Sequence, residues 1–268
     1  MVRRKNGHLR LRIDDLDSTR SRDEWIEDCF ETLESLGIDF DDGPSGVEEF
    51  KKRESQTLFQ DQYWREAEKL IAQKKAYPCE CSRKDIEKTY PDGVYQGNCR
   101  NKELSSNLCA YRFLVDKEKI DVSGKFVEVK KEVGDFVLFR KDGLAAYHLV
   151  SVIEDQRHLI NTIVRGEDLL ASSGAQILLA EALGYADFKK IKFIHHPLLF
   201  RADGKKLSKS QNAPSLLEIL KSGNFSILYC ELEKMLNLEI KITSIRDLLL
   251  LDESDFESKL ERKNNELD

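Results

Sequence analysis

The order of apolar and polar residues near the start of the chain predicts a β-strand followed by a helix. Residues 9–13 (Leu-Arg-Leu-Arg-Ile) alternate with a period of two, which is typical of a strand. In residues 25–36 the apolar side chains recur every three or four positions, which predicts an amphipathic helix that Gly37 ends.

A longer helix is predicted over roughly residues 48–75. Its apolar stripe is interrupted at residues 53–56, which favours a late start of the regular helix. The side chains expected to be buried along this stripe are Phe50, Leu58, Phe59, Tyr63, Ala67, Leu70 and Ile71.

The middle of the chain has the pattern of short strands. The residue before Pro78 avoids the helical region, so residues 77–81 are expected to be extended. Ser82 and Asp85 have the spacing of a capping box that opens a short helix. Short strands are predicted at residues 109–115, 126–129 and 135–140, and a hairpin turn is predicted at 141–144.

Helix and strand patterns alternate again in the second half of the chain. The predicted elements are a short helix at residues 147–154, a buried strand at 161–165, a helix at 169–183 that Gly184 ends, an apolar strand at 192–199 and a helical tail after Pro214. Strand–helix units at both ends of a strand-rich middle favour an α/β fold with a parallel sheet that an insertion interrupts. The expected parts are the two halves of the sheet domain at 1–75 and 136–212, the insertion at 76–135 and the tail at 213–268.

Polar side chains gather after three of the predicted strands. Residues 14–20 carry three aspartates, Arg165 ends a second strand, and residues 204–210 (Gly-Lys-Lys-Leu-Ser-Lys-Ser) follow a third. In open α/β sheets such strand ends converge on one crevice. The cations, hydroxyls and backbone N–H groups of the loop at 204–210 suit a polyphosphate, most of all when charge develops on a leaving pyrophosphate. A solvated basic turn is the alternative for this loop.

Composition limits the kinds of partner and site. The chain has 268 residues and a net charge of −6, so a nucleic-acid partner would have to be met by a local basic face. No apolar run approaches the ~18 residues of a membrane span, and residues 1–7 lack the apolar core of a signal peptide. We therefore expect a cytoplasmic protein. Its six cysteines are then expected to be reduced, and a cluster of them favours a metal over disulfides.

Three cysteines and a tyrosine have a spacing that suits a metal ion. One residue separates Cys79 from Cys81, and Cys99 follows Tyr95 by four positions. Three thiolates would supply three of the four tetrahedral ligands of a structural zinc ion, and Tyr95 could face the same ion. Phenolate is an uncommon zinc ligand, and Cys-x-Cys is a weaker pattern than paired Cys-x-x-Cys motifs. Three unrelated small residues of a reduced protein are the alternative.

Tyr147, Arg165 and Asp14 are candidates for amino-acid recognition. An arginine fork at the end of a buried strand suits a carboxylate, and Asp14 suits an α-ammonium group. The alternative for Arg165 is a structural salt bridge to Glu167 or Asp168.

Other catalytic signals in the sequence are weak. His195 and His196 have no clear partner, and we expect them to be satisfied within the fold rather than to be catalytic. The chain contains no Walker motif, no G-x-G-x-x-G fingerprint and no G-x-S-x-G motif. If the protein uses ATP, it does so with another loop.

In combination these segments resemble the glutamyl-tRNA synthetase family of class I aminoacyl-tRNA synthetases. Residues 206–210 (Lys-Leu-Ser-Lys-Ser) look like the KMSKS motif, and residues 11–20 are similar to the family's Leu-Arg-Ile-Glu-Asp-x-Asp-x-x-Arg stretch. Residues 146–149 and 163–169 match further segments of that family, and the resemblance covers roughly residues 5–220.

One branch of the family is more similar than the others. The metal ligands of the glutamyl-queuosine tRNA(Asp) synthetases are matched by Cys79, Cys81, Tyr95 and Cys99. The chain also continues only briefly after Ser210, so we expect it to lack the large anticodon-binding region of a full glutamyl-tRNA synthetase. In the family a HIGH-type segment precedes the Leu-Arg-Ile stretch, and we expect this chain to lack it. Asp14 stands where the family usually has Glu, and Gly174-Ala175 where it usually has Pro-Arg.

The resemblance implies a Rossmann-like catalytic domain with a zinc-type insertion, and a reaction in two steps. L-glutamate would be activated by ATP with Mg²⁺, and the adenylate would then acylate a hydroxyl of queuosine in the anticodon loop of tRNA(Asp). Lys206 and Lys209 would stabilise the phosphates, with Lys209 binding ATP. Glutamate would be held by Asp14, Tyr147 and Arg165, and one structural Zn²⁺ would be bound.

We expect a monomer. The alternative functions are a catalytically impaired synthetase remnant that binds tRNA or another protein, and a glutamyl-tRNA synthetase fragment that charges the 3′ adenosine.

Overall fold

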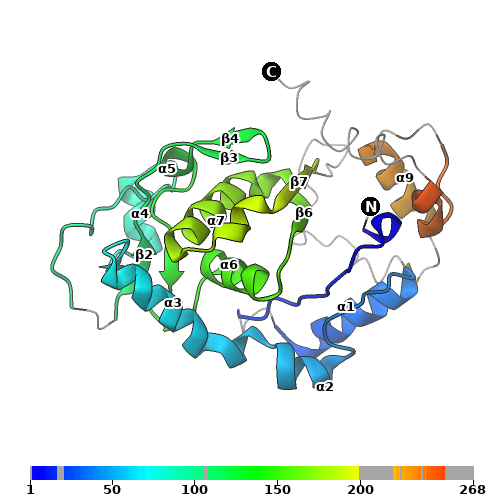
Figure 1. Ribbon diagram of the computed structural model, residues 1–268, viewed down its shortest axis with the longest axis horizontal. Helices are drawn as coiled ribbons and strands as arrows, with labels where there is room; N and C mark the ends of the chain where they lie inside the picture. Colours follow the sequence, from blue (N-terminus) through cyan, green and yellow to red (C-terminus); the bar gives the residue numbers. More distant parts are fainter. Residues whose placement is uncertain are drawn as a thin grey trace. The chain divides into compact units, whose positions relative to one another are not determined.

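The computed structural model describes residues 2–16, 21–105, 108–198, 220–221, 223, 225–236, 238 and 240–250. The chain divides into two compact units, which are described separately (Figure 1). The first unit consists of Met1–Leu58 and His195–Asp268, and the second of Phe59–Ile194. None of the described helices is long and apolar enough to cross a membrane.

The first unit is mainly helical. Its helices are α1 (Asp23–Ser35), α2 (Val47–Glu49) and α9 (Phe225–Leu236), with a π-helical turn at Phe50–Glu54 and 3-10 turns at Arg3–Lys5, Gln56–Phe59 and Ile245–Leu250. The predicted end of α1 is confirmed, because Gly37 has a φ of 66° and the N–H of Ile38 donates to the carbonyl of Leu33 over 2.9 Å. The predicted helical tail is confirmed at α9, whereas residues 251–268 lie outside the described residues.

The predicted strand at residues 9–13 is wrong. The segment is extended, but its backbone forms a single parallel bridge, between Arg10 and Asp42. Neighbouring carboxylates take part of the hydrogen bonding that a strand would use, since the N–H of Leu9 donates to Asp41 Oδ2 over 2.7 Å. The Arg10 guanidinium also pairs with Asp42 and Glu54, so side chains and a few backbone hydrogen bonds hold this segment, which belongs to no sheet.

The predicted interruption of the long helix is confirmed at Ser55. The π-helical turn ends there, and Ser55 has a ψ of 125°, outside the helical range. The carboxylate of Asp15 stabilises this break by accepting hydrogen bonds from Ser55 Oγ over 2.5 Å and from the N–H of Gln56 over 2.8 Å. Burial raises the pKa of Asp15, which is 7% exposed. The expected burial of Leu58 is wrong, because the turn leaves its side chain 52% exposed.

The second unit contains most of the helices and strands. In chain order they are α3 (Gln60–Ala72), β1 (Ala76–Cys79), α4 (Arg83–Thr89), β2 (Ala110–Phe113), β3 (Ile120–Val122), β4 (Lys125–Val127), α5 (Val129–Glu132), β5 (Val137–Phe139), α6 (Tyr147–Arg157), β6 (Thr162–Gly166), α7 (Leu170–Leu183) and β7 (Lys192–His196), with 3-10 turns at Glu167–Leu169 and Ala186–Lys190. The capping box at Ser82 and the end of α7 at Gly184 are confirmed.

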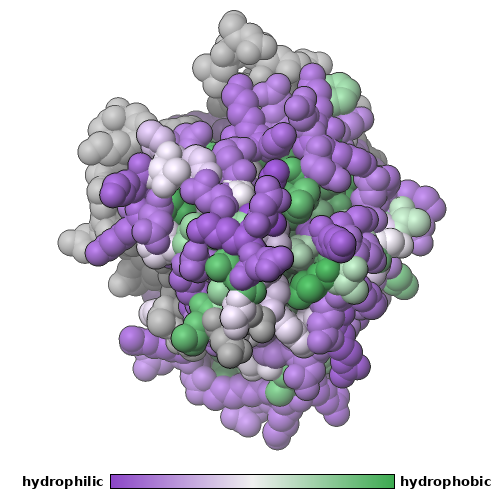
Figure 2. Space-filling view, turned by 90° about the vertical axis from the view of Figure 1, so that its left-hand side faces the viewer, coloured by the Kyte–Doolittle hydropathy of each residue, from purple (hydrophilic) through white to green (hydrophobic). Residues whose placement is uncertain are grey.

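On the side of the molecule that faces left in Figure 1, hydrophilic side chains predominate and hydrophobic ones form small patches (Figure 2).

An antiparallel sheet of three strands, in the order β1-β2-β5, forms one part of this unit. In its register Cys79 pairs with Ala110 and Tyr77 pairs with Arg112. The predicted hairpin turn after β5 is confirmed, because the N–H of Arg140 donates to the carbonyl of Leu144 over 2.9 Å. A separate antiparallel hairpin joins β3 to β4, and its first strand was not predicted.

In place of the larger parallel sheet expected from the sequence, the described residues contain a two-stranded sheet in which β6 and β7 pair with each other beside α7 (Figure 1). The two strands occur where they were predicted, but the burial expected for the first is wrong, since Val164 is 51% exposed. A strand with one described neighbour has an open edge and an open face, and this explains why Val164 is exposed.

The core of the second unit lies between the helices α3, α6 and α7. Tyr63, Ala67 and Leu70 on α3 are fully buried, as the apolar stripe predicted. Gly174 on α7 permits a close approach of the β4–α5 segment, since an added Cβ would lie 3.0 Å from a methyl group of Val129.

Candidate functional site

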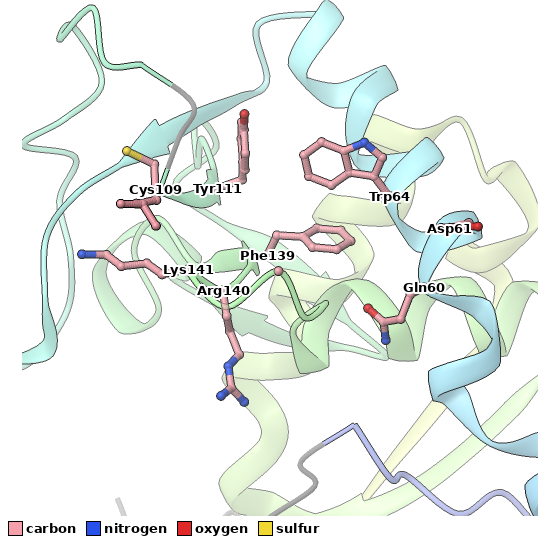
Figure 3. Close-up of a pocket in the computed structure, with 10 residues that line it drawn as sticks. Gln60, Asp61, Trp64, Cys109, Tyr111, Phe139, Arg140 and Lys141 are labelled. Carbon is pink, nitrogen blue, oxygen red and sulfur yellow. The ribbon is translucent and has the colours of Figure 1, made fainter.

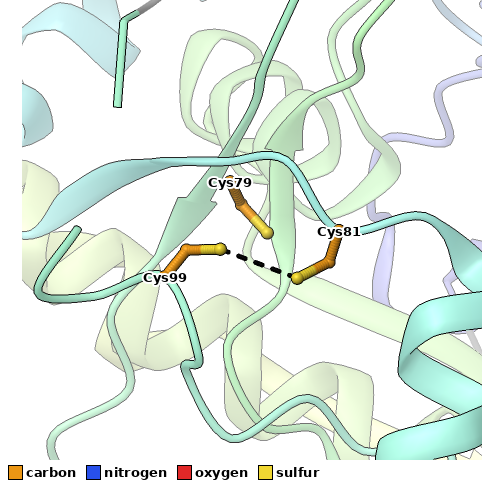
Figure 4. A group of neighbouring side chains, drawn as sticks. All are labelled: Cys79, Cys81 and Cys99. Carbon is orange, nitrogen blue, oxygen red and sulfur yellow. Dashed lines mark hydrogen bonds between the residues drawn. The ribbon is translucent and has the colours of Figure 1, made fainter. Parts of the chain in front are cut away.

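Three thiols and a phenol gather at the end of β1. Cys79 is the last residue of that strand, Cys81 follows it, and Cys99 lies beside both (Figure 4). The turn at 95–99 brings Tyr95 to the same place. The sulfurs of Cys81 and Cys99 are 3.6 Å apart, and the Tyr95 oxygen lies 3.3 Å from Cys79 Sγ and 3.8 Å from Cys81 Sγ. The three sulfur atoms all lie within 4.8 Å of one another.

These distances fit a tetrahedral metal ion. With Zn–S bonds of about 2.3 Å and a Zn–O bond of about 2.0 Å, two sulfurs would be about 3.8 Å apart and a sulfur and an oxygen about 3.5 Å apart. The separations of 3.3 to 3.8 Å in this cluster are close to both values. They are far longer than the ~2.05 Å of a disulfide, and all three cysteines are free. The cluster is therefore a group that could hold a metal ion, and four protein ligands would close the site in the manner of structural zinc.

The surroundings favour the protonated forms of two of these ligands, Cys81 and Tyr95. Burial raises the pKa of Cys81 to about 11. Burial also raises the pKa of Tyr95, and the neighbouring thiols raise it further. A divalent ion would have to displace these protons, so metal uptake by this cluster would be favoured by rising pH.

The buried carboxylate of Asp135 holds the turn that carries Tyr95 and Cys99. The Asp135 carboxylate accepts hydrogen bonds from Arg100 Nη2 over 2.5 Å, from the N–H of Val115 over 2.9 Å and from the hydroxyl of Tyr77. The N–H of Asp135 also donates to the carbonyl of Tyr95 over 2.8 Å. Gly134 makes this contact possible, because a Cβ there would lie 2.4 Å from the Tyr95 carbonyl oxygen. The ligand turn is thus fixed by protein contacts before any metal binds.

Tyr147 and Arg165, predicted from the sequence as recognition residues, are neighbours in the second unit. Tyr147 begins α6, and Arg165 lies near the end of β6. Arg165 Nη1 donates to the Tyr147 hydroxyl over 3.4 Å, and the guanidinium lies 4.9 Å from the centroid of the Phe193 ring. The arrangement presents a planar cation beside a phenol, which suits a carboxylate ligand.

Gln176 completes this group and was not predicted. Its Oε1 accepts a hydrogen bond from Arg165 Nη2 over 2.8 Å, while its side chain is fully buried in α7. The sequence does hold a signal for it, because Gln176 is a polar residue within an otherwise apolar stretch of the helix. Its amide orients the guanidinium from the side opposite solvent.

His148, the next residue after Tyr147, is held neutral in this environment. Its ring packs 4.7 Å from the Phe136 ring and 5.4 Å from the Tyr147 ring, measured between centroids. Burial, with a smaller contribution from the charge of Arg165, lowers the pKa of His148 to about 4. In the part of the chain that the structure describes, its buried Nε2 has no hydrogen-bond partner.

This burial predicts a pH-dependent loss of stability. The unfolded imidazole has a pKa near 6.5, so between about pH 4 and pH 6.5 the unfolded state binds more protons than the folded state. Stability therefore falls as the pH drops through this window, and the loss from His148 between pH 7 and pH 5 is about 2 kcal/mol. A His148→Gln variant is expected to lose about 2 kcal/mol less than the wild type over this interval, measured by denaturant unfolding at both pH values. Substitution of the exposed His8 with glutamine is the control, and equal pH dependence in all three proteins would contradict the prediction.

Asp14 belongs to the first unit and is already engaged there. Its Oδ1 accepts hydrogen bonds from Arg12 Nε over 3.0 Å and from Gln56 Nε2 over 2.6 Å. The side chain is 48% exposed, so it also remains accessible to solvent. Its role toward an α-ammonium group stays a prediction.

The remaining predicted residues are the two lysines of the loop at 204–210 and the two histidines at the end of β7. Lys206 and Lys209, with the loop at 204–210, lie outside the residues that the structure describes. His195 is buried, and His196 Nδ1 lies 2.9 Å from the carbonyl oxygen of Pro197, which agrees with the structural role predicted for both.

A separate pocket of about 370 Å³ lies between α3 and the β2–β5 edge. Its wall includes Trp64, which packs edge-on against Tyr111 and Phe139, while Arg140 and Lys141 extend away from these rings (Figure 3). Arg140 pairs with Asp142 and Lys141 donates to a backbone carbonyl, so both cations already have protein partners. None of the residues predicted for catalysis or recognition lines this pocket.

Comparisons with known proteins agree on one family. Residues 1–226 match the family model described as tRNA synthetases class I (E and Q), catalytic domain. The Glutamyl-Q tRNA(Asp) synthetase of Pseudomonas entomophila is 35% identical over 224 residues, which cover 80% of this chain and 70% of that protein. The glutamate–tRNA ligase of Sulfurihydrogenibium is 34% identical over 244 residues, which cover 84% of this chain and 50% of that protein.

A solved structure gives the same relationship. The glutamate tRNA ligase of Elizabethkingia meningosepticum, determined in complex with its amino acid, superposes with a TM-score of 0.60 at 25% identity. The match covers 77% of this chain and 46% of that one. The chain thus spans about half the length of the glutamate–tRNA ligases that it matches.

Proposed function

Because the chain belongs to the class I tRNA synthetases for glutamate and glutamine, we propose that it activates L-glutamate with ATP and transfers it to queuosine in the anticodon loop of tRNA(Asp). The observation that carries this proposal is the cluster of Cys79, Cys81, Cys99 and Tyr95, whose pattern resembles the queuosine-specific branch. Relatives named Glutamyl-Q tRNA(Asp) synthetase, about 35% identical to this chain, support the same branch.

Glutamate recognition is assigned to the Arg165 group. The guanidinium offers two parallel N–H donors to a carboxylate, and the Tyr147 hydroxyl adds a third polar contact. Hydrogen bonds to Tyr147 and Gln176 orient the cation. Asp14 would bind the α-ammonium group. Positioning of this kind supplies much of the catalysis when the reaction proceeds through an intrinsically reactive adenylate.

The phosphates of ATP are assigned to the loop at 204–210. Lys206 and Lys209 would stabilise the charge that develops on the leaving pyrophosphate, and Mg²⁺ bound with ATP would neutralise part of it. Zinc, held by the three cysteines and Tyr95, would cross-link the end of β1 to the turn at 95–99 without taking part in the reaction.

The first test of this proposal is ATP–pyrophosphate exchange by the full chain. Exchange is expected with L-glutamate and not with L-aspartate, because the Arg165 site must be reached by the longer side chain. Binding of tRNA without any exchange would instead favour the non-catalytic binding protein.

A second candidate function is the charging of a tRNA 3′ end, as the name of the Sulfurihydrogenibium relative indicates for that protein. Pyrophosphate exchange does not separate the two candidates, since both begin with glutamate activation. The acceptor on the tRNA does separate them.

A further inference from the structure

A buried arginine lies against the cysteine–tyrosine cluster and has no part in the function proposed above. Arg112 is in the centre of β2 and is 7% exposed. Its Nε donates to Cys79 Sγ over 3.3 Å, and its guanidinium carbon lies 4.2 Å from the centroid of the Tyr95 ring. Its Nη1 donates to the backbone carbonyl of Asp135 over 2.7 Å.

The strand register explains this position. Cys79 pairs with Ala110 across β1 and β2, so Arg112 occupies the diagonal position two residues further along the same face of the sheet. A long side chain at that position reaches the sulfur directly. Tyr95 then covers the guanidinium from the other side, which places the cation between two predicted metal ligands that are distant in sequence.

The charge of Arg112 is not balanced by a carboxylate. Within the residues that the structure describes, Arg112 forms no ion pair, and the nearby Asp135 carboxylate is occupied by Arg100, Tyr77 and Val115. Burying a cation without an anionic partner is costly. A divalent metal with three thiolates is an anion, and a phenolate ligand would make it more negative. The missing counter-charge is therefore supplied when the cluster binds a metal.

We propose that Arg112 is the counter-cation and positioning residue of the metal centre. It balances the negative charge of the loaded cluster, and it holds Cys79 and Tyr95 at the spacing that a tetrahedral ion requires. This inference rests on the metal site and not on the glutamate-transfer reaction, so the two can fail independently.

Zinc affinity of the full chain tests this role. Competition with a chromophoric chelator is measured for the wild type, R112Q, R112K and R157Q. R112Q is expected to bind Zn²⁺ about 10- to 100-fold more weakly, which is the range for loss of an outer-shell partner of a metal ligand. R112K retains the charge but not the planar fork, so its loss is expected to be smaller than that of R112Q.

R157Q is a matched control. Arg157 on α6 also stacks on an aromatic ring, 3.9 Å from the centroid of Phe59, and donates to the buried Glu154 over 2.7 Å. It lies outside the cluster, so its replacement is expected to leave zinc affinity unchanged. Wild-type affinity in R112Q would overturn the proposal, as would a wild-type chain that binds no zinc at all.

Two further measurements separate the metal role from a general role in folding. The increase in Tm on zinc loading is expected to be smaller in R112Q than in the wild type, whereas a purely structural arginine would lower the loaded and stripped Tm equally. In the Co²⁺-loaded protein, loss of the hydrogen bond to Cys79 raises the energy of the sulfur lone pair. The thiolate-to-cobalt band should therefore shift to longer wavelength in R112Q, and an unshifted band would contradict the assigned contact.

Discussion

An Arg165→Gln variant is expected to lose on the order of a hundredfold or more in kcat/KM for L-glutamate. Removing one partner of a buried, hydrogen-bonded charge pair costs about 2–5 kcal/mol, and about 1.4 kcal/mol corresponds to a factor of ten. The loss should appear mainly in KM, since the guanidinium binds the carboxylate both before and during activation. Glutamate-dependent ATP–pyrophosphate exchange measures it.

Two variants make this result specific. Arg165→Lys keeps the charge but loses the fork that donates to both Tyr147 and Gln176, so it should fall between the wild type and Arg165→Gln. Val164→Ala alters an exposed residue of the same strand and is expected to be neutral. If Arg165→Gln kept the wild-type KM, glutamate would have to bind elsewhere.

Loss of the metal is expected to lower the Tm of the chain by about 10 °C. A ligand present at 1,000 times its Kd contributes about 4 kcal/mol of stability, and in a unit of this size 1 kcal/mol corresponds to about 2–4 °C. Cys79→Ser should show this loss together with the absence of bound zinc in metal analysis, because Cys79 is a fully buried ligand at the end of β1. Stripping the wild type with a chelator should lower its Tm to a similar value.

The cysteines outside the cluster provide the control. Cys29 is exposed on α1 and Cys109 lies before β2, so neither Cys29→Ser nor Cys109→Ser should change zinc content or Tm by a comparable amount. A stripped wild-type protein as stable as the loaded one would show that the cluster does not hold a structural metal.

Local chemistry made several elements predictable from the sequence. The ends of α1 and α7 follow from Gly37 and Gly184, which adopt positive φ values that other residues avoid. The start of α4 follows from the reciprocal hydrogen bonds of Ser82 and Asp85. The closeness of Cys79 and Cys81 follows in the same way from their spacing, whereas Cys99 lies 18 residues beyond Cys81. For the helix ends and for this pair of cysteines, the information lies within a few residues of the feature.

Features that depend on partners distant in sequence were less predictable. The alternation in residues 9–13 is that of a strand, but it cannot show that the segment meets a loop instead of a neighbouring strand, through the Asp41 carboxylate and a single backbone bridge to Asp42. Gln176 and Arg112 acquire their roles only when α7 packs under β6 and β2 pairs with β1. A polar or charged residue in an apolar segment was the available signal for both.

The acceptor of the glutamyl group distinguishes transfer to queuosine from charging of the 3′ end. Transfer of labelled L-glutamate is measured on tRNA(Asp) with and without queuosine, and on each of these with the 3′-terminal adenosine removed. Transfer is expected to both queuosine-containing tRNAs, whether or not the terminal adenosine is present, and none is expected to tRNA that lacks queuosine. Transfer that requires the 3′ adenosine and ignores queuosine would contradict the proposed acceptor.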